Sequence, residues 1–416
     1  MKDIPRFDGE PVGRATLTIS GAPMPSSLEN RLADLDRICR ERIAPRAAAA
    51  DRAASLPPET WRDLVESGYL RLFHPVEFGG SAADGRAVAA AMEGLARACA
   101  STFWVATISS LLCGKLLHEL CGPRHHQRWL RPIVAGEAIG CFAATEAGAG
   151  SDPASYRTFV REDGSGHRLC GAKARISNAT AADVAVVLAR RGGPESAELC
   201  YVVVDLHAPG VRRADTDKLG LRAMSWGTLE FDEVAIDAED VIVGASIDAT
   251  LRTVEWGQLL QAMSGLGIAV AALDALRELA LARHAFGRPI AHLEVIHGRL
   301  ADLAAEIDAA RLLVREVADT KARGRSAREA VMMAKIHATE LAVRAADRAM
   351  RSAGATGYAS DSPIERLYRD SLANVPAGLP NDRLRDFLGC AMVGVDPWSY
   401  PAFEWLAPAG LALAGP

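Results

Sequence analysis

Hydrophobic residues recur at helical spacing in both end regions of the chain. From about Ser27 to Gly136, segments rich in Ala, Leu and Arg carry this pattern and are interrupted at Pro57-Pro58. From about Asp248 the chain returns to long helical patterns, where apolar residues recur at alternating steps of three and four. That spacing forms one continuous stripe, as expected for a helix in an antiparallel bundle. The stripe consists of Leu293, Ile296, Leu300, Leu303, Ile307, Ala310, Val314 and Val317.

Between Glu137 and about Val243 the pattern changes to short β-branched runs, such as Val184–Leu188, separated by Gly, Asp and Pro. We therefore expect an α+β protein in which a compact β domain separates two helical domains, and no parallel sheet of the dinucleotide-binding type. The expected divisions are a leader over 1–26, an N-terminal helical domain over 27–136, a β domain over 137–247 and a helical bundle over 248–416.

Charge and cysteine usage narrow the class of protein. The net charge is −5 and the pI is near 6.1, so the clustered positive charge that nucleic acid or an anionic membrane requires is not expected. The eight cysteines include no C-x-x-C pair, and we expect reduced thiols in a cytoplasmic protein without a metal site. We interpret the one histidine pair, His125-His126, as two surface side chains. No stretch approaches the roughly 18 apolar residues that span a bilayer, so no membrane partner is expected.

The strongest local signal for chemistry is Thr145-Glu-Ala-Gly-Ala-Gly-Ser-Asp152, at the junction between the first helical region and the β region. Its glycines let the backbone approach a ligand closely, and its hydroxyl and N–H groups can hydrogen-bond to that ligand. The segment is thus interpreted as a ligand-cradling loop, with a simple tight turn as the alternative.

This segment resembles the signature T-E-P-G-A-G-S-D of the acyl-CoA dehydrogenases and departs from it only at Ala147. The resemblance covers roughly Leu56 to Asp370 and implies the fold of that family, with a β-barrel-like middle domain and a C-terminal four-helix bundle. It also implies that the cofactor is FAD, that Thr145 contacts the flavin ring and that Ser151 lies near the acyl thioester.

Further motifs follow in the order found in that family. Lys173-Ala-Arg-Ile-Ser-Asn178 is similar to K-x-W-I-T-N, which implies a flavin contact for Ser177. The segment Leu219-Gly-Leu-Arg222 matches the family's G-x-R, and Arg222 is carried over as a substrate-binding residue.

The third domain carries two more matching segments. Arg283-His-Ala-Phe-Gly-Arg-Pro-Ile290 is similar to R-x-A-F-G-K-P-I, whose arginine and phenylalanine reach the FAD of a neighbouring subunit. The planar fork of an arginine suits a pyrophosphate. Gly354 and Gly357 resemble the last FAD-contacting loop. The resemblance therefore assigns Arg283, Phe286, Gly354 and Gly357 to cofactor binding and implies a homodimer or homotetramer.

The catalytic glutamate of the dehydrogenases has no counterpart at either of its customary positions. Counting from Arg369-Asp370, the position in the family's I-Y-E-G-T segment is Gly378. Counting back from Leu266-Gly267, the alternative position is Gly257. Removal of a proton from carbon requires a positioned base, so the usual desaturation lacks its base here.

Three residues remain candidates for a role in catalysis. Glu255 lies two residues before Gly257, about 200° around an ideal helix, and Asp382 lies four residues beyond Gly378. Arg175 replaces the tryptophan beside the flavin ring, where it either stabilises negative charge on the reduced flavin or turns outward into solvent.

Three functions are compatible with these residues. The first is a flavin-dependent oxygenase resembling the acyl-CoA-dehydrogenase-like oxygenases of specialised metabolism, which would use O2 and an acyl thioester of CoA or a carrier protein. The second is α,β-dehydrogenation of such a thioester by a displaced base. The third is a non-catalytic FAD or acyl-CoA binding subunit.

Overall fold

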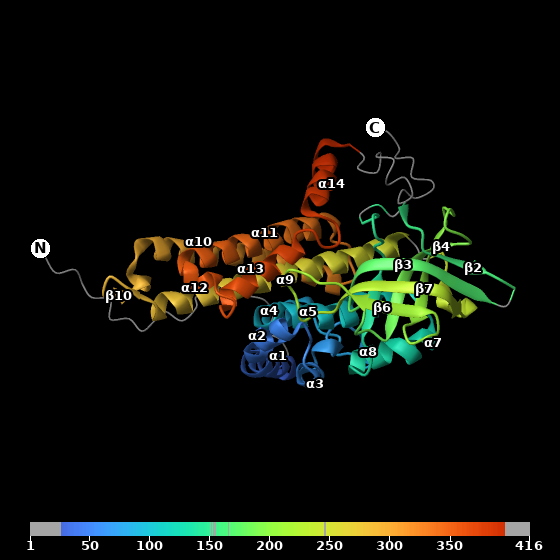
Figure 1. The fold of residues 1–416 in the computed structure, drawn as a ribbon, viewed down its shortest axis with the longest axis horizontal. Coiled ribbons are helices and arrows are strands. Elements are labelled where there is room, and N and C mark those ends of the chain that lie inside the picture. Colours follow the sequence, from blue (N-terminus) through green and yellow to red (C-terminus); the bar gives the residue numbers. More distant parts are fainter. Residues whose placement is uncertain (1–25, 151, 153–154, 165, 245–246, 396–416) are drawn as a thin grey trace, which may run out of the picture.

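A computed structural model describes residues 26–150, 152, 155–164, 166–244 and 247–395. The expected leader over 1–26, apart from Ser26, lies outside these residues, and so does Ser151. The described chain has the α+β architecture expected from the sequence, with the β domain at one end of long helices (Figure 1).

The N-terminal part is helical. It contains eight α-helices and the π-helical turn η4 (Ile108–Cys113) among its described residues. The helices are α1 (Ser26–Ile38), α2 (Ala44–Ala53), α3 (Pro58–Ser67), α4 (Gly85–Ala98), α5 (Ala100–Thr107), α6 (Gly114–Leu120), α7 (Pro123–His125) and α8 (Arg131–Ala135). His125 is buried and its ring contacts Asp240 at 2.9 Å, so the interpretation of this residue as a surface side chain is wrong.

The middle part forms an eight-stranded sheet in the order β6-β7-β3-β2-β4-β5-β8, with β1 pairing parallel to β4. The strands are β1 (Gly140–Ala143), β2 (Phe159–Glu162), β3 (His167–Ser177), β4 (Val184–Arg191), β5 (Leu199–Asp205), β6 (Val211–Asp215), β7 (Trp226–Ile236) and β8 (Val241–Ile242). The run beginning at Val184 is apolar throughout because β4 is buried on both faces. Val184 and Val186 pack with Leu116 and Leu130 of the helices, whereas Ala185 and Val187 face the interior of the sheet domain.

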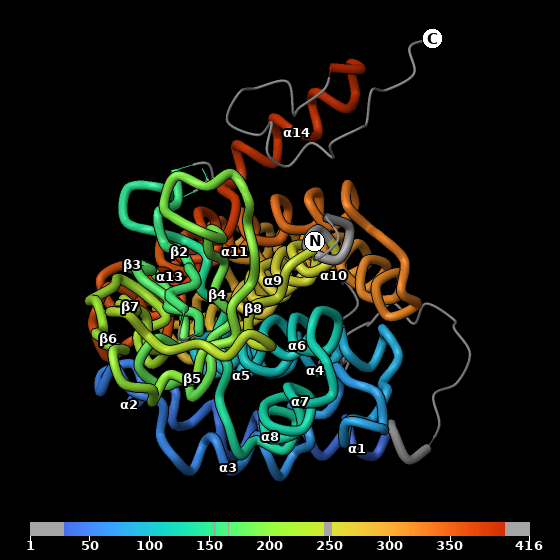
Figure 2. Tube along the Cα trace, turned by 90° about the vertical axis from the view of Figure 1, so that its right-hand side faces the viewer, coloured from blue at the N-terminus to red at the C-terminus, as the bar shows by residue number. Residues whose placement is uncertain are grey.

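The C-terminal part is dominated by three long helices, α9 (Ile247–Ala282), α10 (Glu294–Ala322) and α11 (Arg328–Ala353). They are followed by α12 (Ala355–Tyr358), α13 (Pro363–Asn374) and α14 (Asn381–Val393), while β9 (His284–Ala285) and β10 (Arg288–Pro289) form a small hairpin before α10. The predicted stripe on α10 is confirmed for its main members, since Ile296, Leu303, Ile307 and Val314 are buried. In both views α14 projects from the body of the protein (Figures 1 and 2).

Two helical stretches are long and apolar enough to cross a membrane by composition, which the sequence analysis did not expect. They are Ala100–Leu120 and Arg252–Ala282, and 94% and 78% of their apolar windows are buried inside the protein. Such burial is typical of core helices, and both stretches contribute side chains to the main helical core.

A hydrogen bond to Asp370 of α13 connects the β domain to the bundle. This buried carboxylate accepts a hydrogen bond of 2.6 Å from the backbone N–H of Leu221, in the loop before β7. At the same contact, a side chain on Gly220 would collide with the carbonyl oxygen of Arg369. The glycine thus permits the two backbones to meet.

Asp370 should make the stability depend on pH. Burial raises the pKa of this carboxyl to about 6, against 3.8 without the fold. A raised carboxyl pKa favours the folded state fully below pH 4, and this contribution is lost as the pH rises through 6. The unfolding free energy of the unaltered protein should therefore fall by up to about 3 kcal/mol between pH 4 and 6, and Asp370→Asn should abolish this fall. Urea unfolding across this range measures it, with exposed Asp382→Asn as the control; equal slopes in the two variants would contradict the assignment.

Candidate functional site

The loop that begins at Thr145 is held by buried charge. Lys173 of β3 donates to the Glu146 carboxylate at 2.8 Å, and both side chains are buried. The same carboxylate accepts hydrogen bonds from the backbone N–H groups of Arg157 and Thr158. Burial alone would raise the pKa of Glu146, but Lys173 and these N–H groups outweigh it and hold the pKa below its usual value. The loop is therefore fixed by the protein's own groups.

The loop lies directly against an irregularity in β3. The carbonyl oxygen of Thr145 accepts a hydrogen bond of 2.9 Å from the N–H of Ala174. The pairing of β3 with β7 shifts register between Lys173 and Ile176, and Arg175 in this bulge has a left-handed φ of 62°. An L-residue in that conformation is uncommon. Thr145 therefore lies beside the bulge that contains Arg175, and half-buried Ser177 ends the same strand.

Arg175 is exposed, but it does not extend freely into solvent. Its guanidinium carbon lies 5.1 Å from the ring centroid of Trp226, and Trp226 pairs with Ser177 across the two strands. The stacking of a guanidinium on an indole is attractive. Sequence reasoning missed Trp226, although its position at the start of β7 opposite the Lys173–Asn178 motif could have suggested it.

Gly378 lies in the loop between α13 and α14, and this loop is anchored by a buried lysine. Lys335 of α11 donates to the carbonyl oxygens of Val375 and Leu379 and to the side-chain oxygen of Asn381, at 2.8, 3.0 and 2.7 Å. Lys335 is fully buried. A single ammonium group therefore fixes the loop on both sides of Gly378.

The side-chain amide of Gln261 occupies the space beside Gly378. A Cβ atom on residue 378 would lie 2.6 Å from Nε2 of Gln261, and the φ of Gly378 is 61°. A carboxylate at this position would therefore need both a strained backbone and a displaced glutamine. Gly257, one turn before Gln261 on α9, is less confined, because its Cβ would meet only Leu112 of η4, at 3.7 Å.

The two carboxylates considered as displaced bases are engaged elsewhere. Glu255 is buried and accepts hydrogen bonds from Lys321, Ser326 and the N–H of Ala327, at 2.8, 2.7 and 3.1 Å. Burial alone would raise the pKa of Glu255, but Lys321 and Ser326 outweigh it and lower the pKa. The Asp382 side chain is 95% exposed and pairs with Arg385 on the projecting helix α14.

The other cofactor-binding candidates gather at the opposite end of the long helices, near β10 and α12 (Figure 1). Arg283 donates to the carbonyl oxygen of Ala353, beside Gly354, whose φ is 59°. Phe286 is 92% exposed, and buried Gly357 packs tightly enough that a Cβ would meet Ala353 at 2.5 Å. The structure thus brings the Arg283 and Gly354 segments together but places them far from Thr145 within one chain.

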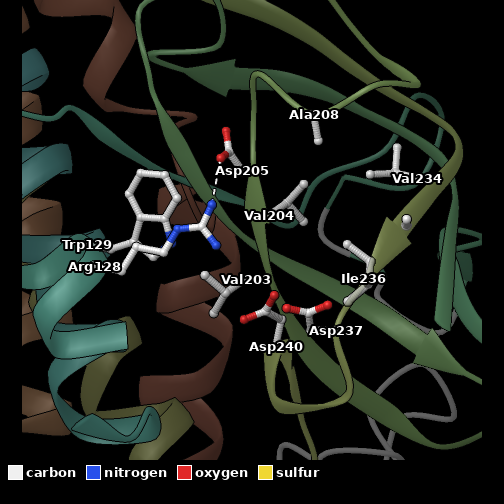
Figure 3. Close-up of a pocket in the computed structure, with 11 residues that line it drawn as sticks. Arg128, Trp129, Val203, Val204, Asp205, Ala208, Val234, Ile236, Asp237 and Asp240 are labelled. Carbon is white, nitrogen blue, oxygen red and sulfur yellow. Dashed lines mark hydrogen bonds and ion pairs between the residues drawn. The ribbon is translucent and has the colours of Figure 1, made fainter. Parts of the chain in front are cut away.

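Arg222 is half-buried in the loop that Asp370 holds, and its carbonyl oxygen accepts a hydrogen bond from Lys218. A cavity of 170 Å³ elsewhere on the β domain is lined by Arg128, Trp129 and Asp205 among others, with Arg128 paired to Asp205 (Figure 3). That cavity is lined by none of the candidate residues.

Within the described part of the chain, no group of three or more His, Cys, Asp or Glu residues could hold a metal ion.

Comparisons with known proteins agree with this geometry. Sequence profiles of the acyl-CoA dehydrogenase N-terminal, middle and C-terminal domains match residues 29–137, 141–234 and 247–389. The short-chain specific acyl-CoA dehydrogenase of Rattus norvegicus mitochondria is 33% identical over 346 residues, which cover 81% of this chain and 84% of that protein. The 3-(aryl)acrylate reductase of Clostridium sporogenes is 32% identical, covering 79% and 89%.

A solved structure of a glutaryl-coenzyme A dehydrogenase in complex with glutaryl-CoA superposes with a TM-score of 0.86 at 27% identity, covering 91% of this chain and 98% of that one. Together with the three matching domains, these similarities show that the chain belongs to the acyl-CoA dehydrogenase superfamily.

Proposed function

We propose that this protein is an FAD-dependent oxidoreductase that oxygenates an acyl thioester of CoA or a carrier protein instead of desaturating it. The observation that carries the proposal is that residue 378 is a glycine in a left-handed conformation, with the neutral Gln261 amide 2.6 Å from the place of an added Cβ. Family membership supports the cofactor and the thioester, while the absence of a base at residues 257 and 378 argues against removal of a proton from the α-carbon.

The residues present fit FAD. Thr145 lies beside the bulge at Arg175, Ser177 ends the same strand, and Asn178 after it has a buried side-chain oxygen without a partner among the described residues. Bound FAD supplies two-electron redox chemistry. Thr145 and Ser177 would orient its ring, and the guanidinium of Arg175 would offset negative charge near it.

Arg283, Phe286 and Gly354 would serve the same cofactor from a second copy of the chain. They are exposed at the far end of the bundle, where one chain alone cannot bring them to Thr145. A homodimer or homotetramer would complete the site in this way. The exposed Phe286 supports this arrangement, because a large aromatic side chain gains most from burial in an interface.

Oxygenation and dehydrogenation require different reagents. Oxygenation requires dioxygen and an external two-electron reductant; one oxygen atom enters the product and the other leaves as water. Dehydrogenation requires only the thioester. The purified yellow protein should therefore keep its colour when mixed anaerobically with acyl thioesters, and it should incorporate label from isotopic dioxygen once a reduced nicotinamide or reduced flavin is supplied. Bleaching by thioester alone would establish the dehydrogenase instead, and protein that binds no flavin would favour a binding subunit.

Dehydrogenation by a displaced base is the second candidate, favoured by the dehydrogenases among the relatives. Its base would be Glu255 or Asp382. Because Glu255 neutralises buried Lys321, Glu255→Gln should lower the unfolding free energy by about 3 kcal/mol. It should leave the turnover of folded enzyme within about twofold. Thermal unfolding and turnover below the transition measure both effects, with exposed Asp361→Asn as the control. Loss of turnover without loss of stability would support a displaced base.

A further inference from the structure

An apolar stripe follows one face of α14, and only its first half is buried. Residues at helical spacing form the stripe, namely Leu384, Phe387, Leu388, Ala391, Met392 and, just after the helix, Val395. Leu384 and Phe387 are buried, whereas Ala391, Met392 and Val395 are exposed, with Met392 at 87%. A contiguous apolar surface that stays exposed usually marks a site where another element packs. The second half of the stripe therefore lacks its cover among the described residues.

The projection of α14 is fixed by its first two turns. The Asn381 side chain accepts a hydrogen bond from Lys335 at 2.7 Å and donates one to the Thr339 hydroxyl at 3.1 Å. Arg385 donates to the Glu340 carboxylate at 2.6 Å. These bonds hold the start of α14 on α11, and the rest of the helix leaves the body of the protein (Figures 1 and 2). The exposed half of the stripe is thus a product of the fold itself.

The chain turns sharply at the end of α14. Gly394 has a left-handed φ of 72°, and its N–H donates to the carbonyl oxygen of Ala391 at 3.4 Å. The N–H of Val395 donates to the carbonyl oxygen of Cys390 at 2.9 Å. This pair of bonds is a Schellman motif, which ends a helix, and Pro397 after it cannot continue the helix. The residues after Val395 therefore begin beside the exposed stripe.

Residues 396–416, which lie outside the described residues, have the composition of a covering segment. Aromatic residues are enriched there compared with 6% in the whole chain, and charged residues are few. The aromatic residues are Trp398, Tyr400, Phe403 and Trp405, and the charged ones are Asp396 and Glu404. From Trp398 to Trp405 an extended chain spans about 26 Å, whereas the 13 residues of α14 span about 20 Å. The segment is therefore long enough to run back along the helix.

We propose that residues 396–416 fold back and cover the exposed half of the α14 stripe in the same chain, with their aromatic side chains against Met392 and Val395. Because the segment is joined to the stripe, packing there costs less entropy than recruiting a second molecule. The two arginines and two aspartates of α14 balance in charge, so the helix offers no complementary surface to a strongly charged partner. A second copy of the chain is the competing occupant.

Hydrogen exchange followed by mass spectrometry tests the proposal on the full chain and on a chain that ends at Val395. Truncation should lower the protection of residues 388–395 at least about tenfold, because burial of one large apolar side chain shifts an equilibrium by at least that factor. Exchange in β4 should stay unchanged. In the full chain, Met392→Ser should act in the same direction as truncation. Val393→Ser is the matched control, since Val393 is 74% exposed but lies off the stripe.

Protection of residues 388–395 that survives truncation would overturn the proposal. Protection that falls when the full chain is diluted about a hundredfold would also overturn it, because a second copy would then be the cover. Equal losses in Met392→Ser and Val393→Ser would show only a weaker helix, and this result too would contradict the assignment. The exchange measurement does not depend on flavin chemistry, so its outcome is separate from that of the oxygenation assay.

Discussion

Introducing a glutamate at residue 378 should create more dehydrogenase activity when Gln261 is shortened in the same chain. In Gly378→Glu alone, the new Cβ collides with the Gln261 amide at 2.6 Å in a left-handed backbone. Gly378→Glu with Gln261→Ala removes the collision and leaves only the backbone strain, about 1–2 kcal/mol. A positioned base contributes typically about 10²–10⁴-fold. We expect a gain in that range in the rate of anaerobic flavin bleaching by butyryl-CoA, measured by stopped flow.

Gly257 provides a matched comparison within the same site. It has a helical backbone and its Cβ would make only an ordinary contact with Leu112. Gly257→Glu should therefore be tolerated without a second change and give a gain of its own. Gln261→Ala alone should give none. If Gly378→Glu alone bleached the flavin as fast as the double variant, the amide would not be the obstacle that we infer.

Removing the ammonium group of Lys335 should release the loop around Gly378. Lys335→Met keeps the length of the side chain but leaves the carbonyl oxygens of Val375 and Leu379 and the Asn381 side chain without their shared donor. A hydrogen bond to a charged group contributes about 1.5–3 kcal/mol. Partial rehydration of the loop offsets part of this, so we expect a loss of about 3 kcal/mol in unfolding free energy.

The loop effect can be separated from the general loss of stability. Hydrogen exchange should rise selectively in residues 375–381, because those groups share the lysine, while the exchange of β4 stays unchanged below the transition. Lys218→Met is a control, since Lys218 bonds a single carbonyl oxygen, that of Arg222. Uniform exchange across the whole chain would indicate that Lys335 contributes only to global stability.

The order of elements was predictable from periodicity alone. The stripe on α10 and the doubly buried strand β4 each leave a pattern that depends only on which faces are covered. The Thr145 segment could also be recognised from its closely spaced glycines and hydroxyls, and the Arg283 segment from its resemblance to the family's motif. The resemblance implied that the two segments serve cofactors of different subunits, but their places within one chain depend on the lengths and directions of helices far apart in sequence.

The polar residues around Gly378 could not be identified from the sequence. Gln261 stands in α9 among buried residues that are mostly apolar, and its significance arises only because the loop after α13 places Gly378 beside it. Lys335 likewise has the pattern of an ordinary helical lysine in the sequence, and only the packing of α11 against that loop shows its role. Trp226 contacts Arg175 through a bulge that no periodicity predicts.

The buried salt bridge between Glu146 and Lys173 determines how a cofactor would bind to this loop. Since the side-chain partners of Glu146 come from β3 and from Arg157 and Thr158 just before β2, we expect the described part of the loop to keep its shape whether or not a nucleotide is present. Removal of the proposed FAD should therefore leave the amide hydrogen exchange of Arg157, Thr158 and Ala174 unchanged. Reconstitution would then proceed as docking onto a preformed surface, at a rate proportional to the concentration of added cofactor.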